Sequence, residues 1–452
     1  MNQFDRLSDV RLWDRHHVWH SFTQMAEYEP FLIERAQGCW LFDSEGRRYL
    51  DGVSSMWCNV HGHNHPVINE AIRRQLDKVA HVTSLGMGNS TTATLAYRLV
   101  QKSPQKLQHV FFSSDGASAV EVALKLAFQY WRQCDTPQPQ RSLFLALGQA
   151  YHGDTLGSVS VGGVSRFHAM FAPLLFDVLR GPCPDSFRKP KQYQGTDLTS
   201  YYLSSYEKLL IEHGDRVAAI ITEPLVQGAA GMVMHPPGFL RGLRDLADRY
   251  KTLLIVDEIA TGFGRTGTLW ACQQESVEPD LLCSGKGLSG GYLPISATLA
   301  STEIWNAFLG PYEQSKSFFH GHTFGGNPLA AAAALATLDL FESENTLQQI
   351  PQKAAKLAEL LAPLRDHPHV GDVRQRGLIA AVELVRDKST LQPYPWEQRR
   401  GVLACQRALR EEVWMRPLGN VIILMPPLVI DDAEMEQLVH AAKVGIDAAT
   451  QA

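Results

Sequence analysis

Residues 252–257, Thr-Leu-Leu-Ile-Val-Asp, form a short apolar run that ends in a carboxylate. Three similar runs, apolar at both odd and even positions, lie elsewhere in the chain: 109–112, 142–147 and 218–222. Strands that are buried on both faces have this pattern, which is typical of a parallel sheet. Between the runs lie stretches with apolar residues at helical spacing, such as 120–131 and 239–250. This alternation predicts an α/β fold with a mostly parallel sheet.

The composition excludes several classes of partner. The 452 residues are 45% hydrophobic and 20% charged, with a net charge of −5 and no basic stripe that could neutralise nucleic-acid phosphates. The longest charge-free apolar run, residues 328–338, is far shorter than the ~20 residues of a membrane-spanning helix. Charged residues from Asp5 to Arg15 interrupt any signal-peptide core, and none of the seven cysteines has CxxC spacing. We therefore expect a cytoplasmic protein without a disulfide framework, a metal site, or a nucleic-acid or membrane partner.

The character of the chain changes near residue 330. Asn327 followed by Pro328 predicts a helix start, because Asn caps helices and Pro fits the first helical position. Helical patterns dominate after it, with short strands near 377–385 and 421–424, while residues 41–47 resemble a hairpin turn. The sequence thus predicts three parts: an N-terminal segment at 1–60 that contributes to the small domain and the active site, a large cofactor-binding domain at 61–330, and a small C-terminal domain at 331–452.

Asp257 and Lys286 are the first candidates for chemistry. Ligands of a buried parallel sheet bind outside the carboxyl ends of its strands, and Asp257 ends an apolar run. Lys286 follows 29 residues later, between two glycines. Taken singly, Asp257 fits a helix cap or a solvated strand end, and Lys286 fits an exposed surface. Taken together, they are the pair that a pyridoxal phosphate enzyme needs: a lysine for the Schiff base and an acid that keeps the pyridine nitrogen protonated.

A phosphate cradle is predicted at residues 113–118, Ser-Ser-Asp-Gly-Ala-Ser, which link a strand to a helix that begins near Ala119. Gly116 permits close approach of the backbone, and the N–H groups and dipole at a helix N-terminus attract an anion. A plain strand-to-helix turn is the alternative interpretation. Tyr151 offers an aromatic ring that could stack on a cofactor.

Two other motifs suggest different chemistry. Residues 262–267, Gly-Phe-Gly-Arg-Thr-Gly, match the GxGxxG of a dinucleotide-binding turn, but they do not follow the strand directly and no clear helix comes after them. Arg265 within them is assigned to the substrate pocket, with a structural role in the loop as the alternative. His61, His63 and His65 alternate like metal ligands on a strand, yet the neighbouring glycine and proline indicate ordinary loop histidines.

Two longer motifs resemble those of the class III, fold-type I aminotransferases, which depend on pyridoxal phosphate. They are residues 254–267, LIVDEIATGFGRTG, with Lys286 beyond them, and residues 321–328, GHTFGGNP. The resemblance covers nearly the whole chain and implies a homodimer whose large domain has a mostly parallel seven-stranded sheet beside a smaller α/β domain. Within the family, the chain is most similar to the branch that converts 8-amino-7-oxononanoate to 7,8-diaminononanoate in biotin biosynthesis. That closer similarity rests on three stretches: 17–25, 51–57 and 416–419.

The resemblance also implies roles for single residues. Lys286 would form the Schiff base, Asp257 would pair with the pyridine nitrogen, and Tyr151 would stack on the ring. Val226 and Gln227 would pack on the opposite face and reach the phenolic oxygen. The remaining cofactor contacts would come from Gly116, Ala117, His152, Glu223, His322 and, across a dimer interface, Thr323. Substrate contacts would come from Phe22, Met56, Trp57, Tyr151, Arg265, Gly321 and, as the receiver of a substrate carboxylate, Arg416.

The amino donor is left open by two positions. Relatives that use S-adenosylmethionine have Tyr at the position of Phe22 and a Trp pair at the position of Met56-Trp57. Loss of that hydroxyl and of one broad ring would weaken binding of a sulfonium cation, which favours aromatic faces. A branch of the family that resembles this chain at both positions uses L-lysine instead. The resemblance therefore implies S-adenosylmethionine, the family default, or L-lysine as the donor. A 4-aminobutyrate or diamine:pyruvate ω-aminotransferase is the alternative within the fold, and an NAD dehydrogenase or a non-catalytic binding protein is the alternative outside it.

Overall fold

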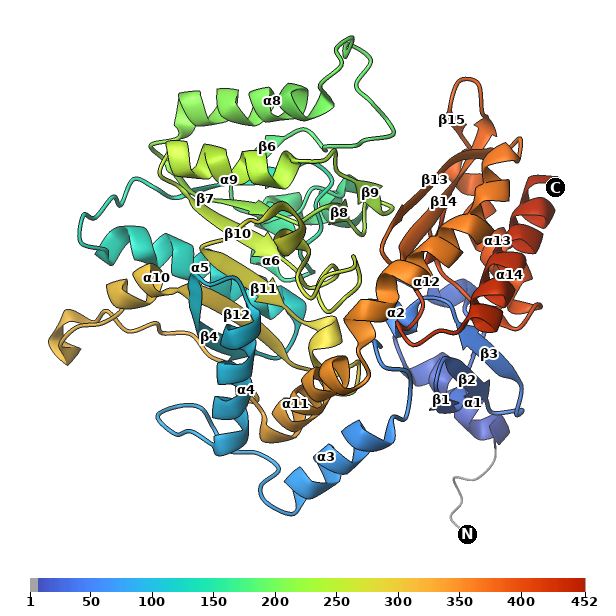
Figure 1. Cartoon of the computed structure of the whole chain (residues 1–452), viewed down its shortest axis with the longest axis horizontal. Coiled ribbons are helices and arrows are strands. Elements are labelled where there is room, and N and C mark those ends of the chain that lie inside the picture. Colours follow the sequence, from blue (N-terminus) through green and yellow to red (C-terminus); the bar gives the residue numbers. More distant parts are fainter. Residues whose placement is uncertain (1–6, 452) are drawn as a thin grey trace.

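A computed structural model describes residues 7–451 of the chain, and its largest sheet has seven strands. Their order across the sheet is β4 (Leu107–Ser113), β12 (Ser296–Ser301), β11 (Leu281–Ser284), β10 (Leu253–Asp257), β7 (Val217–Thr222), β5 (Leu143–Leu147) and β6 (Leu179–Gly181). β12 runs antiparallel to both of its neighbours, and the pairings from β11 through to β6 are parallel. The predicted α/β fold with a mostly parallel seven-stranded sheet is confirmed (Figure 1).

Helices that precede residue 310 connect these strands or lie near the N-terminus. They are α1 (Leu7–His17), α2 (Ser54–Trp57), α3 (Pro66–Leu76), α4 (Ser90–Lys102), α5 (Gly116–Gln133), α6 (Leu156–Val161), α7 (Ser165–His168), α8 (Leu198–His213), α9 (Phe239–Arg249) and α10 (Thr302–Ala307). Among residues 7–451, no helix is both long enough and apolar enough to cross a membrane.

The two faces of β10 explain why its sequence is apolar throughout. Ile255 belongs to the hydrophobic cluster under α5, whereas Leu254 and Val256 belong to the larger cluster on the other face, where α8 and α9 pack. All three side chains have no exposed surface. Figure 1 shows α8 and α9 on one side of the sheet and α5 on the other. Because both faces are covered, the ends of the strands are where a ligand can reach the sheet.

A second sheet lies in the C-terminal third. It contains β13 (Val370–Arg376), β14 (Ile379–Asp387), β18 (Val421–Leu424), β17 (Pro417–Leu418) and, paired to β14, β15 (Gln392–Pro393). The helices of this region are α11 (Pro328–Ser343), α12 (Thr346–Leu361), α13 (Arg400–Leu409) and α14 (Asp432–Gln451). The strands predicted near 377–385 and 421–424 correspond to β14 and β18.

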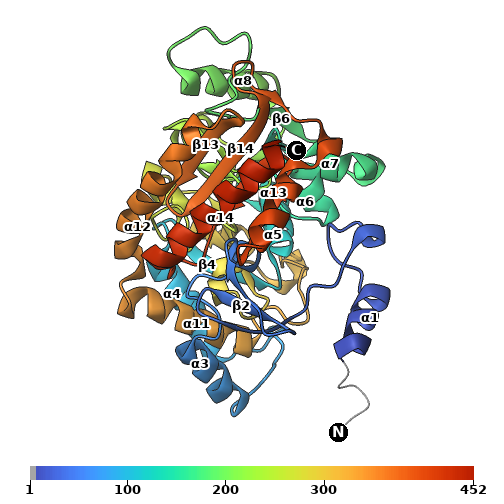
Figure 2. The same cartoon turned by 90° about the vertical axis from the view of Figure 1, so that its right-hand side faces the viewer.

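The N-terminal segment joins this C-terminal region through a third sheet. β1 (Ile33–Gln37), β2 (Trp40–Asp43) and β3 (Arg48–Asp51) form an antiparallel meander, and β3 pairs in parallel with β16 (Val413–Trp414). Figure 2 shows β2 beneath α13 and α14. The two ends of the chain therefore fold together, although the first six residues of the predicted 1–60 segment lie outside the described part. The boundaries proposed for the three parts stay a prediction.

Caps fix where two of the helices begin. α11 starts at Pro328, and the Asn327 side chain accepts from the N–H groups of its first turn, which confirms the predicted start. α5 starts at Gly116, three residues before the predicted position of Ala119, because Asp115 acts as the cap and accepts from Ser118 N at 2.9 Å. The earlier start places Gly116 in the first turn of the helix rather than in the loop before it.

The central position of β10 leads to a stability prediction. Replacing Ile255, which is fully buried, by alanine leaves a cavity under α5 and should lower the free energy of unfolding by about 2–5 kcal/mol. The matched control is Ile211→Ala on α8, whose side chain is 70% exposed and should change stability by less than about 0.5 kcal/mol. Denaturant unfolding of both variants, followed by circular dichroism, measures the difference. Equal midpoints for the two variants would contradict this view of the core.

Candidate active site

A cavity of about 490 Å³ opens where β4, β5, β7, β10 and β11 end. Its size is typical of a site for a small molecule or cofactor. Its lining residues are Trp57, Asp115, Gly116, Ala117, Tyr151, His152, Gly153, Asp154, Thr155, Glu223, Ala229, Asp257, Ile259, Ala260 and Lys286. Eight of the residues predicted from the sequence are thus brought together: Trp57, Gly116, Ala117, Tyr151, His152, Glu223, Asp257 and Lys286.

Asp257 is held at the floor of this cavity by two contacts. Its Oδ2 lies 2.7 Å from Nδ1 of His152, and its Oδ1 accepts from Ile259 N at 3.0 Å. Both side chains are buried, and Nε2 of His152 has no hydrogen-bond partner among residues 7–451. A buried carboxylate oriented in this way is suited to stabilise a positive charge on a ring nitrogen.

Lys286 is separated from the end of β11 by Gly285 and has a left-handed backbone conformation with φ of 41°. Its Nζ is 5.4 Å from the centre of the Trp57 ring. Burial lowers the pKa of the Lys286 amine, although the nearby Asp257, Cys58 and Glu223 oppose that shift. A lysine with a lowered pKa exposes more of its free amine at neutral pH, and the free amine is the form that attacks a carbonyl.

The first turn of α5 forms a cradle for an anion. The first N–H groups of a helix have no intrahelical acceptor, and here they belong to the cavity-lining Gly116 and Ala117. A Cβ on Gly116 would lie 2.9 Å from Cγ2 of Ile259, so a side chain there would collide with the cavity wall. A Cβ on Gly153 would lie 2.4 Å from Cβ of Ala117, and the φ of Gly153 is +117°. Both glycines therefore keep the space beside the helix N-terminus open.

Tyr151 and Glu223 complete one wall. Glu223 accepts from Tyr151 N at 3.1 Å and from Gly228 N at 2.8 Å, and burial raises its pKa to about 7. The Tyr151 hydroxyl donates to Asp154 Oδ2 at 2.7 Å. Burial, together with this bond, raises the pKa of Tyr151, so the ring stays a neutral phenol. The wall thus presents an aromatic ring whose position is fixed at both its backbone and its hydroxyl.

These groups fit pyridoxal phosphate. The helix N-terminus with Gly116 and Gly153 suits the phosphate, Asp257 suits the pyridine nitrogen, and the buried Lys286 amine suits the aldehyde. Tyr151 supplies a ring that can stack. The fit rests on the free helix-end N–H groups and on the space that each glycine leaves for a ligand.

Four residues assigned to the cofactor do not line the cavity: Val226, Gln227 and, as described below, His322 and Thr323. Val226 is buried in a hydrophobic cluster that also contains the cavity-lining Trp57, and the Gln227 side chain donates to Gly148 O at 3.0 Å. Ile259, which no sequence argument selected, lines the cavity instead. It lies two residues after Asp257, so the signal was the Asp-Glu-Ile order at the end of β10. A β-branched apolar side chain at that point can cover the face of a flat ring.

Arg265 does not line the cavity, and its assignment to the substrate pocket stays a prediction. Its side chain is 1% exposed, and its guanidinium donates to Pro426 O at 2.6 Å and to Asn59 O at 2.7 Å. It therefore ties the 262–267 loop to two distant segments. The structural alternative for this residue is the one that the geometry favours. Bends and the 3-10 helix η3 (Ala271–Glu275), rather than an α-helix, follow the GxGxxG-like motif, so it does not have the strand–turn–helix context of a dinucleotide site.

The other predicted substrate residues lie around the cavity or away from it. Phe22 is 60% exposed and contacts the edge of Phe167, which in turn contacts Tyr151. Met56 is 38% exposed beside the cavity-lining Trp57. Arg416 is half-buried, and within residues 7–451 its guanidinium has no hydrogen bond or ion pair. An unpaired guanidinium of this kind is available to an anionic ligand.

Gly321, His322 and Thr323 do not line the cavity of their own chain, and Gly321 and Thr323 are exposed. The three alternating histidines have separate partners. Nε2 of His61 lies 3.0 Å from Thr337 O, and Nε2 of His63 lies 2.9 Å from Asp51 Oδ2. His65 caps α3.

Comparison with known proteins agrees with this geometry. The chain matches the model for class-III aminotransferases over residues 23–444. It is 51% identical to an adenosylmethionine-8-amino-7-oxononanoate aminotransferase of Nitratidesulfovibrio vulgaris, with 99% of this chain and 83% of that protein covered. It is 49% identical to the protein of the same name from Geobacter sulfurreducens, with 98% of each chain covered.

Solved structures are also similar. A crystal structure of adenosylmethionine-8-amino-7-oxononanoate aminotransferase from Methanocaldococcus jannaschii has a TM-score of 0.91 at 42% identity, with 98% of this chain and 99% of that chain covered. An (S)-enantioselective ω-transaminase from Thermomicrobium roseum has a TM-score of 0.94 at 33% identity, with the same coverage.

The glycine cradle can be tested by one added methyl group. Gly153→Ala forces a left-handed backbone and a contact with Ala117, which together should cost at least about 1–3 kcal/mol in the cofactor-binding conformation. The dissociation constant of pyridoxal phosphate, measured by equilibrium dialysis, should therefore rise about tenfold or more. Gly88→Ala is the control, because a Cβ there meets no atom within 4 Å. An unchanged constant for Gly153→Ala would show that this turn does not shape the cofactor site.

Proposed function

The chain belongs to the class III aminotransferases, and from this premise we propose that it transfers an amino group to the ketone of 8-amino-7-oxononanoate, giving 7,8-diaminononanoate in biotin biosynthesis. It is a pyridoxal phosphate-dependent enzyme. The observation that carries transamination is the shared cavity of Lys286, Asp257 and the α5 N-terminus. The choice of substrate is supported by the name of its full-length relatives at up to 51% identity.

The roles of the residues follow from their positions. Bound pyridoxal phosphate supplies an electron sink next to the substrate carbon that carries nitrogen. Lys286 Nζ, whose pKa burial lowers, would remove the proton from that carbon and return a proton at the end of the transfer. Asp257, oriented by His152, would keep the pyridine nitrogen positively charged. Tyr151 and Ile259, which line the cavity, would cover the ring and exclude water.

Arg416 is the proposed receiver of the acceptor's carboxylate. 8-Amino-7-oxononanoate carries its carboxylate at the far end of the chain from its ketone, so a cation is needed away from Lys286. Arg416 belongs to the C-terminal region, beside β17, and its guanidinium is unpaired in the described part of the chain. A guanidinium binds a carboxylate through two parallel hydrogen bonds, which fixes direction as well as charge.

The donor is proposed to be S-adenosylmethionine or L-lysine. The relatives' printed name favours the first, whereas Phe22 and Met56 favour the second. Phe22 has no hydroxyl to offer, and Met56 replaces an aromatic face that a sulfonium would prefer. An ω-aminotransferase is the second candidate function, supported by the similarity to the enzyme from Thermomicrobium roseum.

We also propose a cytoplasmic homodimer. Several large apolar side chains are mostly exposed on the loops around residues 85–87 and 319–324: Leu85, Met87, Phe319 and Phe324. Exposed apolar groups gathered on neighbouring loops are typical of an interface between subunits. His81 and Phe324 are 4.7 Å apart between ring centres, so the two loops are adjacent. In such a dimer the partner subunit's Thr323 would complete the phosphate site.

The function is tested by single half-reactions of the holoenzyme. Mixing with S-adenosylmethionine or with L-lysine should remove the visible absorbance of the bound cofactor, and 8-amino-7-oxononanoate should restore it. The donor that produces the change is the physiological one. Lys286→Ala should lose both turnover and the starting absorbance, because no other amine lines the cavity. No response to either donor, with 4-aminobutyrate or a diamine active instead, would replace the proposal by the ω-aminotransferase.

The role of Arg416 has its own test. Arg416→Gln should raise the KM for 8-amino-7-oxononanoate by about 10–200-fold, because a charge-assisted contact contributes about 1.5–3 kcal/mol. The methyl ester of the substrate, which has no charge to lose, should be used equally well by both proteins. Steady-state kinetics of both proteins with both acceptors measures the change in KM for the acid and the change in KM for the ester. An equal fall in activity toward the ester would show that Arg416 does not act by binding the substrate carboxylate.

A further inference from the structure

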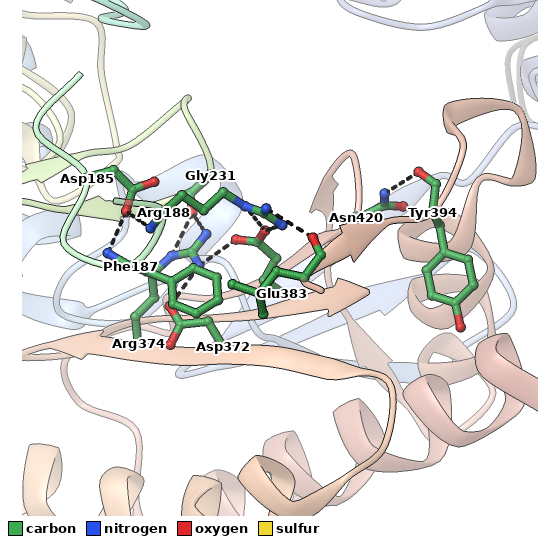
Figure 3. A network of polar contacts seen from close by, with 10 residues as sticks. Asp185, Phe187, Arg188, Gly231, Asp372, Arg374, Glu383, Tyr394 and Asn420 are labelled. Atoms are coloured by element: carbon green, nitrogen blue, oxygen red, sulfur yellow. Dashed lines mark hydrogen bonds and ion pairs between the residues drawn. The ribbon is translucent and has the colours of Figure 1, made fainter. Parts of the chain in front are cut away.

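A buried network of charges joins the C-terminal sheet to the large-domain loops (Figure 3). Glu383 on β14 accepts through Oε2 from Arg374 Nη1 at 2.7 Å and through Oε1 from Arg188 Nε at 2.7 Å. Arg374 Nη1 also donates to Asp372 Oδ2 at 3.0 Å. Two guanidinium groups thus face two carboxylates, so the charges balance.

The two arginines connect different parts of the chain. Arg188 follows β6 and reaches the C-terminal sheet, where it also donates to Leu391 O at 3.1 Å. Arg374 lies on β13 and reaches in the other direction, donating to Gly231 O at 2.6 Å and Met232 O at 2.9 Å. Gly231 and Met232 lie in the turn between β8 (Val226–Gln227) and β9 (Val233–Met234). We call Arg188, Arg374 and Glu383 the clamp. Arg188 reaches from the large domain to the C-terminal sheet, and Arg374 reaches from that sheet to the large domain.

The burial of this clamp makes its geometry demanding. Arg374 is 9% exposed and Glu383 is 8% exposed. Burial would lower the pKa of Arg374, but the Glu383 and Asp372 carboxylates outweigh it and the pKa is raised. A buried charged pair is stable only when its hydrogen bonds are all made, so the two partners hold each other in one position.

On the C-terminal side, the clamp is two strands away from Arg416. Glu383 on β14 is paired with Val421 on β18, and Val421 is paired with Leu418 on β17. Leu418 is two residues from Arg416. Each link is a register contact of one sheet, so a shift of Glu383 is passed to the segment that carries Arg416.

On the other side, the clamp holds a wall of the cavity. Gly228 N donates to Glu223, and Ala229 lines the cavity, just before the clamped Gly231. A Cβ on Gly231 would lie 3.2 Å from Val421 Cγ2, so the turn packs directly against β18. The hairpin that borders the cofactor cavity and the strand next to Arg416 are therefore in contact at the clamp.

We propose that Arg374 and Glu383 are positioning residues that set the distance and direction from Arg416 to Lys286, and that they thereby select acceptors with a remote carboxylate. The inference rests on the proposed function, because it needs Arg416 to receive that carboxylate. Neither residue lines the cavity. Their effect on substrate choice acts through the sheet that both share with β17.

The test compares a charged acceptor with an uncharged one. Enzyme loaded with pyridoxamine phosphate is mixed with 8-amino-7-oxononanoate or with its methyl ester, and the rate of each half-reaction is followed by absorbance. Arg374→Lys and Glu383→Gln should each lower kcat/KM for the acid about tenfold or more through KM, because small misplacements of a binding group have effects of this size. The ester should change by less than about twofold.

A matched control separates positioning from stability. Arg244 is 5% exposed and pairs with Asp280 at 2.7 Å inside the large domain, away from the C-terminal sheet. Arg244→Lys should lower the melting temperature without changing the acid-to-ester ratio. If Arg374→Lys fails to fold, Arg188→Lys, at the partly exposed end of the network, replaces it.

A double mutant identifies the residue through which the clamp acts. In the Arg416→Gln background, Arg374→Lys should cause no further change in the acid-to-ester ratio. Three results would each overturn the inference: equal losses for acid and ester, a fall in the acid-to-ester ratio in Arg244→Lys as large as that in Arg374→Lys, or additive effects of Arg374→Lys and Arg416→Gln. A wild-type enzyme that does not use the acid at all would overturn the proposed function instead.

Discussion

The active site depends on one buried contact, the 2.7 Å approach of His152 to the Asp257 carboxylate at the end of β10. A carboxylate in an apolar interior is costly unless it is hydrogen-bonded, and here the imidazole and the Ile259 N–H supply those bonds. The strand is buried on both faces, so Asp257 cannot turn away toward solvent. Lys286, which follows the end of the neighbouring strand β11, and the α5 N-terminus are arranged around this fixed charge.

The fold was predictable because its signals are local. Apolar side chains at both odd and even positions of 253–256 follow directly from two covered faces of the sheet. Asn327 and Pro328 mark the start of α11 through the capping bond and the fixed backbone angle of those two residues alone. The cavity residues Asp257 and Lys286 were predictable for a similar reason, since Asp257 ends β10 and Lys286 follows closely after β11 in the same sheet. The predicted start of α5 came three residues too late, because the prediction followed the apolar periodicity and Asp115 caps the helix before that periodicity begins.

The roles of residues that depend on packing between distant segments were harder to predict from the sequence. An arginine at position 265 suggests a substrate pocket, because arginine often binds anionic ligands. Its hydrogen bonds to Asn59 and Pro426 can be seen only in the folded structure. Ile259 and Val226 are chemically alike, and only the course of the backbone after β10 decides which one meets the cavity. The Arg188–Glu383–Arg374 network joins residues nearly two hundred positions apart, for which a single sequence contains no pattern.

The parallel pairing of β3 with β16 has a consequence for synthesis on the ribosome. The strands of the large sheet are all made by Ser301, so that layer can assemble while translation continues. β1, β2 and β3 are made before this sheet but must wait for Trp414, which is made after it. The N-terminal meander therefore stays incomplete until after the large sheet has been made, and the arginine at 416 arrives only when this layer closes. A nascent chain would acquire its cofactor cavity before it acquires the means to recognise a substrate.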